Sequence, residues 1–308
     1  RRIKQLGLTD LVYPGALHSR FHHALGAMHL MYTAIQVIRR KGHEITAEEE
    51  HAVLCAILLH DIGHGPFSHT LEYDIVNGVS HEEISSMFIH ALGKSFAGKL
   101  DLSLAIFQNK YEKPFLHQLV SSQLDMDRLD YLNRDSFYTG VSERIIEMLN
   151  VHDGQLVLEE KGIYSVEKFI VARRLMYWQV YLHKTVVSAE LMLIHLLRRA
   201  KKLVESGQDL FASPSLQFFL KNKIGLEDFK TNPIVLDHFA NLDDFDILGA
   251  IKVWKESPDL ILSDLSRRLV NRDLLKIEIS KEPFSAERIL QERKDLVEKW
   301  KISFEDSA

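Results

Sequence analysis

Histidines and carboxylates gather in the first third of the chain, and their spacing suggests metal chemistry. Eleven of the 16 histidines in this 308-residue sequence precede residue 91. The adjacent pair His60-Asp61 follows an apolar run and comes just before Gly63, a helix-stop signal. Neighbouring helical residues diverge by about 100°, so both side chains reach one ion most easily where a helix ends. An imidazole and a carboxylate suit Fe, Mn, Co, Ni or Zn, and the carboxylate can also bridge to Mg²⁺.

Other polar groups accompany this pair. Three histidines follow it: His64, His69 and His81. Glu72 lies three residues after His69, and Arg20-Phe21-His22-His23 stands upstream. Residues 124–132 contain three carboxylates, a guanidinium and a phenol, and Asp127 and Tyr131 share a helical face by their i, i+4 spacing. Together these groups favour a ligand site over an ordinary solvated helix end.

The elements that would position these residues are mainly helical. Apolar residues recur at intervals near three and four from Arg20 to Arg40, and Lys41-Gly42 supplies a stop signal. Thr46 and Glu49 predict a capping box that opens a second helix, which should end near His60-Asp61. Similar patterns predict helices over about 80–96, 101–109, 114–121, 125–138, 165–206, 213–222, 233–256, 258–269 and 284–301.

Strand signals are few. Residues 155–159 and 163–166, on either side of Lys161-Gly162, predict a short hairpin, and residues 275–279 predict one isolated strand. The sequence therefore predicts a mostly α protein, a helical bundle with a short β-hairpin and a smaller, mainly helical C-terminal region. A turn-rich stretch over 207–214 places the expected boundary between a core at 1–207 and the C-terminal region at 208–308.

Composition narrows the function classes. The formal net charge is −5 and no basic run is long, so neither nucleic-acid binding nor a polybasic membrane tether is expected. The longest apolar run, Ala52 to Leu59, is less than half of what a membrane-spanning helix requires. The lone Cys55 fits a reducing, cytoplasmic location. Because the chain opens with Arg1-Arg2-Ile3 and not with Met, we expect it to be the ordered part of a longer protein.

These motifs resemble those of the HD-domain phosphohydrolases, and more closely their deoxynucleoside triphosphate (dNTP) triphosphohydrolase branch, which includes bacterial dGTPases. His23, His60-Asp61 and Asp127 meet the family's H…HD…D pattern. The stretches HDIGHGPFSH at 60–69 and DRLDY at 127–131 read like the branch itself. The resemblance covers residues 1 to about 200 and implies an HD-domain helical core.

The resemblance implies that a divalent transition metal is bound by His23, His60, Asp61 and Asp127. The donor set agrees, because two neutral imidazoles and two carboxylates leave positions open for water and phosphate. The implied reaction is hydrolysis of a dNTP at the α-phosphorus, which releases a deoxynucleoside and tripolyphosphate, with Mg²⁺ accompanying the nucleotide. His69 with Glu72 resembles the family's catalytic dyad. His64 and His81 resemble its phosphate-contacting histidines, although His81 could instead supply the acid, and the spacing leaves open which group activates water.

The same resemblance implies the candidates for nucleotide contacts, which are Gln5, Leu6, Arg20, Arg128, Tyr131, Asp135, Arg173, Tyr177 and Tyr181. Arg173, Tyr177 and Tyr181 stand at i, i+4 and i+8, which predicts one stripe along a long helix. By resemblance, Arg173 reaches the γ-phosphate and Tyr181 packs against the deoxyribose. The remaining histidines, His18 among them, are interpreted as surface or packing residues.

Two alternatives stay open. Another HD-domain enzyme could use the same metal on a nucleoside monophosphate or a phosphodiester, and such a substrate would offer Arg173 no γ-phosphate. A nucleotide-sensing regulatory protein would bind without turnover. Relatives in this branch commonly form dimers, tetramers or hexamers, so the resemblance also implies a homo-oligomer.

Overall fold

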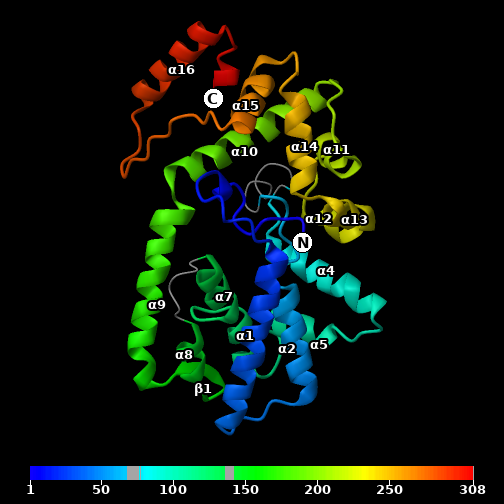
Figure 1. The fold of residues 1–308 in the computed structure, drawn as a ribbon. Helices are drawn as coiled ribbons and strands as arrows, with labels where there is room; N and C mark the ends of the chain where they lie inside the picture. Colours follow the sequence, from blue (N-terminus) through cyan, green and yellow to red (C-terminus); the bar gives the residue numbers. More distant parts are fainter. Residues whose placement is uncertain (68–75, 77, 136–141, 308) are drawn as a thin grey trace. The chain divides into compact units, whose positions relative to one another are not determined.

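The computed structural model describes residues 1–67, 76, 78–135 and 142–307. The chain divides into two compact units, residues 1–275 and residues 276–308 (Figure 1). The prediction of a mostly α fold with one short hairpin is confirmed. The candidate site lies in the first unit, which contains two hydrophobic cores.

The first core surrounds the helix pair α1 (Arg20–Arg40) and α2 (Ala47–Leu59), which lie side by side in Figure 1. Both helices have the predicted bounds. The predicted capping box is present, because the Glu49 amide donates to Thr46 Oγ1 at 3.1 Å and the Thr46 amide donates to Glu49 Oε2 at 2.8 Å. The same core includes residues of α5 (Asp101–Phe107), α6 (Pro114–Val120), α7 (Met126–Asp135), α8 (Ser142–Glu147) and α9 (Ile163–Met176).

The second core surrounds the amphipathic helix α10 (Lys184–Glu205) and is closed by Trp254, whose side chain is fully buried. Its other helices are α11 (Pro214–Lys221), α12 (Leu226–Thr231), α13 (Pro233–Asn241), α14 (Asp244–Trp254) and α15 (Leu260–Asn271). Leu8, which precedes the short helix η1 (Thr9–Leu11), and Ile84 of α4 (His81–Ser95) also join this core. The N-terminal segment thus packs against helices that lie almost 200 residues further along the chain.

Two predicted helices are each broken by a capping residue. The helix expected over 165–206 consists of α9, a π-helical turn η3 (Tyr177–Tyr181) and α10, with a bend of 57° before Lys184. His183 ends the first part because its Nδ1 accepts from the Thr185 amide at the start of α10. The helix expected over 233–256 is α13 and α14, because Asp243 caps α14 by accepting from the Phe245 amide at 2.8 Å.

The predicted strand at 155–159 is present as β2 (Gln155–Leu158), but its predicted partner at 163–166 and the isolated strand at 275–279 are wrong. The hairpin pairs β1 (Leu149–His152) with β2 around Asp153-Gly154, whose φ angles of 49° and 74° suit the tightest hairpin turns. Residues 163–166 instead begin α9. Residues 275–279 form no strand, and the Leu275 carbonyl accepts from Ser188 Oγ of α10 at 2.5 Å, so it has no partner strand there.

The second unit contains α16 (Ala286–Trp300), close to the predicted 284–301, and the short helix η4 (Glu305–Ser307). An ion pair between Arg288 and Glu278 ties α16 to the segment before it. The domain boundary expected at residue 207 stays a prediction. In the described part of the chain, no single helix is long and apolar enough to cross a membrane; α9 with η3 and α10 pass that test only as a bent pair.

Candidate active site

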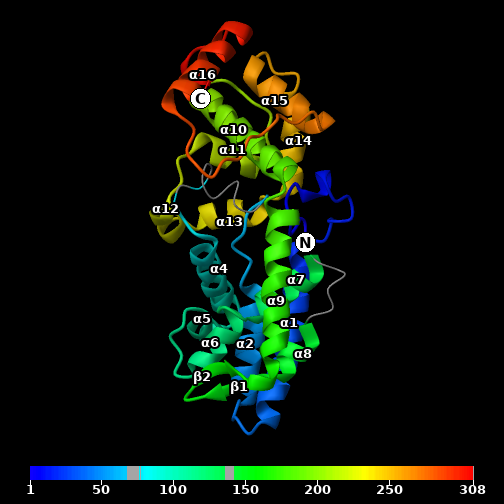
Figure 2. The same ribbon diagram turned by 90° about the vertical axis from the view of Figure 1, so that its left-hand side faces the viewer.

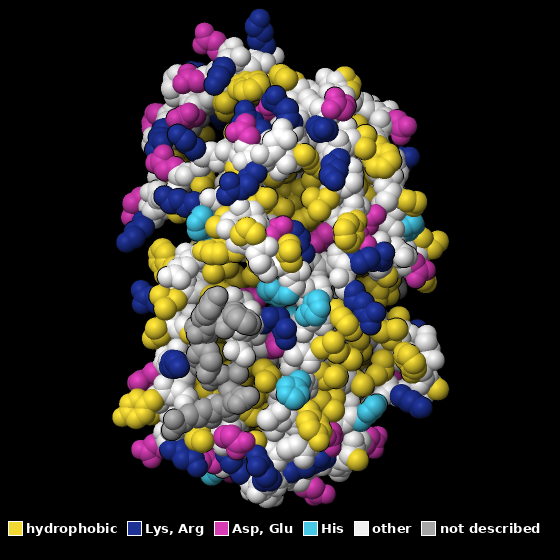
Figure 3. Space-filling model, in the orientation of Figure 1, with side chains coloured by type: hydrophobic (Ala, Val, Ile, Leu, Met, Phe, Trp, Pro, Cys, Tyr) yellow, Lys and Arg dark blue, Asp and Glu magenta, His cyan; other side chains and the backbone are white. Residues whose placement is uncertain are grey.

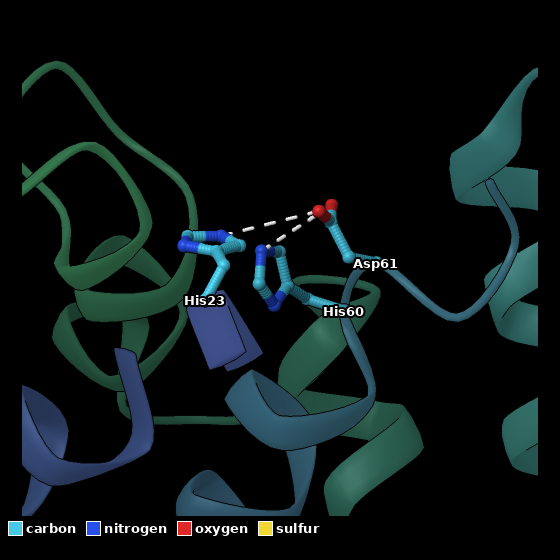
Figure 4. A group of neighbouring side chains, drawn as sticks. All are labelled: His23, His60 and Asp61. Carbon is cyan, nitrogen blue, oxygen red and sulfur yellow. Dashed lines mark ion pairs between the residues drawn. The ribbon is translucent and has the colours of Figure 1, made fainter. Parts of the chain in front are cut away.

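Three segments bring the four predicted metal ligands together. His23 lies in the first turn of α1, His60 and Asp61 follow the end of α2, and Asp127 lies in the first turn of α7. One ligand atom from each of His23, His60 and Asp61 lies within 4.8 Å of the others, and Figure 4 shows the three side chains pointing toward one another. Asp127 Oδ1 lies 3.0 Å from His23 Nε2 and 3.5 Å from His60 Nε2.

The Nδ1 atom of each imidazole has a hydrogen-bond partner. His23 Nδ1 lies 2.7 Å from Asp130 Oδ2, and His60 Nδ1 lies 2.5 Å from the Ile57 carbonyl oxygen. Each contact fixes a ring with its Nε2 atom toward the carboxylates. Both Nε2 atoms are buried and form no hydrogen bond among the described residues, even though Asp127 Oδ1 is close. Two buried imidazole nitrogens facing two carboxylates fit a divalent transition metal.

The electrostatics of the cluster also favour a bound cation. Burial opposes the charged form of His23, but Asp127 and Asp130 outweigh it and raise the pKa of His23 to about 10. Burial similarly opposes ionisation of Asp61, yet His60, His64 and Arg20 hold its pKa well below the usual range. The pKa of Asp127 is also lowered, because the nearby His23 and His60 outweigh its burial. The carboxylates therefore stay ionised and attract positive charge to the space between them and the imidazoles.

His64 and His81 form a second layer beside this cluster. Their rings stack with centroids 3.9 Å apart, and His64 Nε2 lies 3.4 Å from Asp61 Oδ1. Burial and the Arg20 guanidinium lower the pKa of His64 to about 4, so His64 is neutral at pH 7. The close approach of α4 requires Gly63, because a Cβ atom there would stand 2.2 Å from the His81 carbonyl oxygen.

A cavity of about 720 Å³ opens beside the cluster, and Figure 3 shows histidine, basic and acidic side chains gathered near the middle of this face. Its wall includes His64, His81, Asp61 and Asp127 and all nine candidates for nucleotide contacts: Gln5, Leu6, Arg20, Arg128, Tyr131, Asp135, Arg173, Tyr177 and Tyr181. Arg173, Tyr177 and Tyr181 reach it from both α9 and η3, although the helix expected to carry them is broken. The predicted dyad of His69 and Glu72 lies outside the described residues.

Several side chains of the wall are fixed by hydrogen bonds. Arg20 Nη1 donates to Asp61 Oδ2 at 2.5 Å. The backbone amide and Nε of Arg128 both donate to the buried Asp125, at 2.7 and 3.2 Å. Tyr181 Oη donates to Asp135 Oδ2 at 2.7 Å. These contacts hold cationic and aromatic groups in place around the cavity.

Three residues of the site were missed by sequence reasoning. Asp130 orients His23, and its i, i+4 partner Arg134 was a readable signal, since it lies on the same face of α7. His18, interpreted as a surface or packing residue, places Nε2 2.8 Å from Asp135 Oδ1. Asp125 was visible only as one of three neighbouring carboxylates. The contacts of His18 depend on tertiary structure, and no sequence pattern indicated them.

Comparison with known proteins agrees with this geometry. The HD domain model matches residues 20–135, and the HD associated region model matches residues 142–212. A crystal structure of a phosphohydrolase from Bacteroides thetaiotaomicron is 55% identical, with a TM-score of 0.95 over 99% of this chain and 77% of that one. The chain therefore belongs to the HD-domain phosphohydrolase superfamily.

Two curated proteins are also similar to this chain in sequence. The uncharacterized protein YwfO of Bacillus subtilis is 38% identical over 90% of this chain. The deoxynucleoside triphosphate triphosphohydrolase SAMHD1 homolog of Dictyostelium discoideum is 33% identical, also over 90% of this chain. The chain spans 64% of the length of the first relative and 54% of the second.

Proposed function

We propose that the protein is a metal-dependent dNTP triphosphohydrolase, which cleaves its substrate at the α-phosphorus into a deoxynucleoside and tripolyphosphate. One observation carries the proposal. Three arginines, Arg20, Arg128 and Arg173, line the same cavity as Asp61 and Asp127. Three guanidiniums match the charge of a triphosphate better than that of a monophosphate.

The buried cluster supplies the hydrolytic part. His23, His60, Asp61 and Asp127 would hold the divalent transition metal, which lowers the pKa of water and stabilises charge on the phosphoryl oxygens. The neutral His64 offers a phosphate a hydrogen bond without a charge of its own. Arg20, fixed against Asp61, carries positive charge at the edge of the cluster. We retain the dyad of His69 and Glu72 as the pair that exchanges protons with water or the departing 5′-oxygen.

Other residues of the cavity wall suit a deoxyribose. Tyr181 is locked by its hydrogen bond to Asp135, so its ring cannot easily move aside for a 2′-hydroxyl group. Gln5 Oε1 is buried and makes no hydrogen bond in the described structure, and it could accept one from a sugar hydroxyl. Leu6 lines the cavity next to it. These contacts support a deoxynucleotide over a ribonucleotide.

The first experiment is chromatography of the products after incubation with each dNTP and with GTP, in Mg²⁺ and then in Mn²⁺. We expect deoxynucleoside together with tripolyphosphate, and the four rates would show whether the preference is dGTPase-like. Phosphate or pyrophosphate as the product would contradict cleavage between the α-phosphorus and the 5′-oxygen, because either product requires a bond within the triphosphate to break. If metal-loaded protein hydrolysed no triphosphate but did hydrolyse a nucleoside monophosphate or a phosphodiester, the alternative activity would replace this one.

A variant pair tests the role of the γ-phosphate. Arg173→Ala removes a guanidinium from the cavity wall, and we expect KM for the dNTP to rise about tenfold or more, as for loss of a charged hydrogen bond. Lys168→Ala is the control, because Lys168 is exposed on the same helix and does not line the cavity. Equal KM values for the two variants would contradict the triphosphate assignment. We further propose, from the same resemblance, a homo-oligomer located in the cytoplasm.

A further inference from the structure

His18 connects three residues of the cavity wall, although it does not line the cavity itself. Its imidazole Nε2 lies 2.8 Å from Asp135 Oδ1. Its backbone carbonyl oxygen accepts a hydrogen bond from the Gln5 amide at 2.9 Å. Asp135 in turn accepts a hydrogen bond from Tyr181 Oη at 2.7 Å. The two residues assigned above to the sugar, Gln5 and Tyr181, therefore both depend on His18 for their position.

The carboxylate of Asp135 lies between two donors. Its side chain is 1% exposed, whereas that of His18 is 19% exposed. Burial and the Asp135 carboxylate raise the pKa of Tyr181, so the Tyr181 hydroxyl keeps its hydrogen and donates it to Oδ2. A carboxylate only accepts, so Nε2 of His18 carries the hydrogen of the other contact. Removal of the His18 donor would take one hydrogen bond from a buried charged group, and the carboxylate would then turn toward other donors.

The N-terminal segment that contains His18 also holds the backbone of η3. Tyr13 Oη donates to the Gln179 carbonyl oxygen at 2.7 Å. Figure 2 shows this segment, in blue, beside the junction of α9 and α10. Single π-helical turns such as η3 are rare and often occur at functional sites. Residues 13–18 therefore fix η3 twice, through its backbone at Gln179 and through the side chain of Tyr181.

We propose that His18 is a positioning residue that gives the site its preference for a deoxyribose over a ribose. The inference rests on the proposed function, because it takes Tyr181 as the group that crowds a 2′-hydroxyl. His18 holds Asp135, and Asp135 holds the Tyr181 ring where that hydroxyl would lie. When the His18 donor is removed, Asp135 turns and the Tyr181 ring moves aside, so that the site admits a ribose.

Equilibrium binding separates positioning from a purely structural role. Calorimetry measures the dissociation constants of the deoxyribose and ribose triphosphates of guanine and of adenine. A methylene group replaces the 5′-oxygen of each analogue, so the proposed cleavage cannot occur. His18→Ala should lower the ratio of the ribose to the deoxyribose dissociation constant about tenfold, as for the loss of a hydrogen bond to a charged group. A purely structural role would change both dissociation constants by the same factor, and the contact with Gln5 survives because it uses the backbone of residue 18.

Three further variants make the test specific. His18→Gln should restore most of the ratio, because its amide offers Asp135 a hydrogen at a similar position. His29→Ala should leave the ratio unchanged and is the matched control, since His29 is exposed on α1 and does not line the cavity. In an Asp135→Ala background, His18→Ala should change the ratio no further, because the two residues act through the same contact.

The outcomes distinguish this inference from the proposed function. An unchanged ratio in folded His18→Ala protein, no recovery in His18→Gln, or equal effects of His18→Ala in both backgrounds would overturn the role of His18. Wild-type protein that binds both sugars equally tightly would overturn the sugar preference, whereas dNTP hydrolysis would stand. Wild-type protein that binds none of the analogues would contradict the triphosphate function as well. His18→Leu, which fills the space without a donor, replaces His18→Ala if circular dichroism shows that variant to be unfolded.

Discussion

Replacing Asp130 by Asn would show whether the carboxylate behind His23 governs metal binding. Asp130 Oδ2 lies 2.7 Å from His23 Nδ1. Asp130 also accepts hydrogen bonds from Nε and Nη2 of Arg134, at 2.9 and 2.8 Å. Every one of these contacts is a donor approaching the carboxylate. Asn keeps the size of the side chain, but its amide nitrogen must face either His23 or Arg134, where a donor would meet a donor.

Two arguments give the size of the effect. A hydrogen bond to a charged group contributes about 1.5–3 kcal/mol, and each 1.4 kcal/mol corresponds to about tenfold in affinity. Carboxylates that orient metal-binding histidines independently contribute about ten- to a hundredfold in metal affinity. We therefore expect Asp130→Asn to raise the apparent dissociation constant of Mn²⁺ or Zn²⁺ by one to two orders of magnitude.

The assay is competition with a chromogenic chelator at fixed pH, with thermal unfolding as the check that the variant folds. Arg134→Gln is the matched control, because it removes the other partner of Asp130 and leaves the contact with His23 in place. Its effect should be several times smaller. A folded Asp130→Asn protein with wild-type metal affinity would refute the idea that Asp130 holds the His23 ring for a metal.

Three further predictions follow from the same contacts. Asp127→Ala should abolish metal binding and hydrolysis together, which metal analysis of the purified protein checks. Burial opposes ionisation of Glu49, but Lys113 and the Thr46 amide outweigh it and lower the pKa of Glu49. The ionised Glu49 therefore stabilises the fold above its ordinary pKa, and this stabilisation is lost as pH falls through the pKa of the folded state. Glu49→Gln should cost about 1–3 kcal/mol near pH 7, and the free energy of unfolding of the variant should fall less steeply in acid. Gly63→Ala should destabilise the protein by about 1–3 kcal/mol, because the new Cβ clashes with the α4 backbone. Gly249→Ala should stabilise it by about 0.5–1 kcal/mol, because the Cβ at that position meets nothing within 4 Å. Chemical denaturation measures both changes.

Local chemistry made much of the fold predictable from the sequence. Arg20–Arg40 and Ala47–Leu59 were predictable because an apolar stripe, a capping box and a glycine all agree on the same bounds. The break at His183 was not, because a single histidine whose ring caps α10 competes with an otherwise continuous helical pattern. The hairpin was misplaced because Lys161-Gly162 and Asp153-Gly154 both look like turns. The stronger signal was Asp153-Gly154, because Leu149 and Val151 before it and Leu156 and Leu158 after it alternate with other residues as in two paired strands.

The candidate site was predictable as a set of residues and not as a network. The H…HD…D pattern and the arginines could be recognised in the sequence, because their residue types are typical of metal binding and of positive charge. Their partners were not, because Asp130, Asp125 and His18 act through contacts whose geometry only the folded chain defines. A carboxylate that caps a helix and one that orients an imidazole look alike in a sequence.

The helices that follow residue 207 take part in shaping the site. Asp244, at the start of α14, is buried and accepts hydrogen bonds from the backbone amides of Lys4 and Phe67, at 2.9 and 3.3 Å. Lys4 immediately precedes Gln5 and Leu6, and Phe67 lies three residues after His64 in the segment that follows α2. One carboxylate at the start of α14 thus fixes two backbone segments that contribute residues to the cavity wall. A buried carboxylate keeps such amides in place only while α14 is packed against the second core, so the position of Gln5 and the stability of residues 208–275 are physically linked.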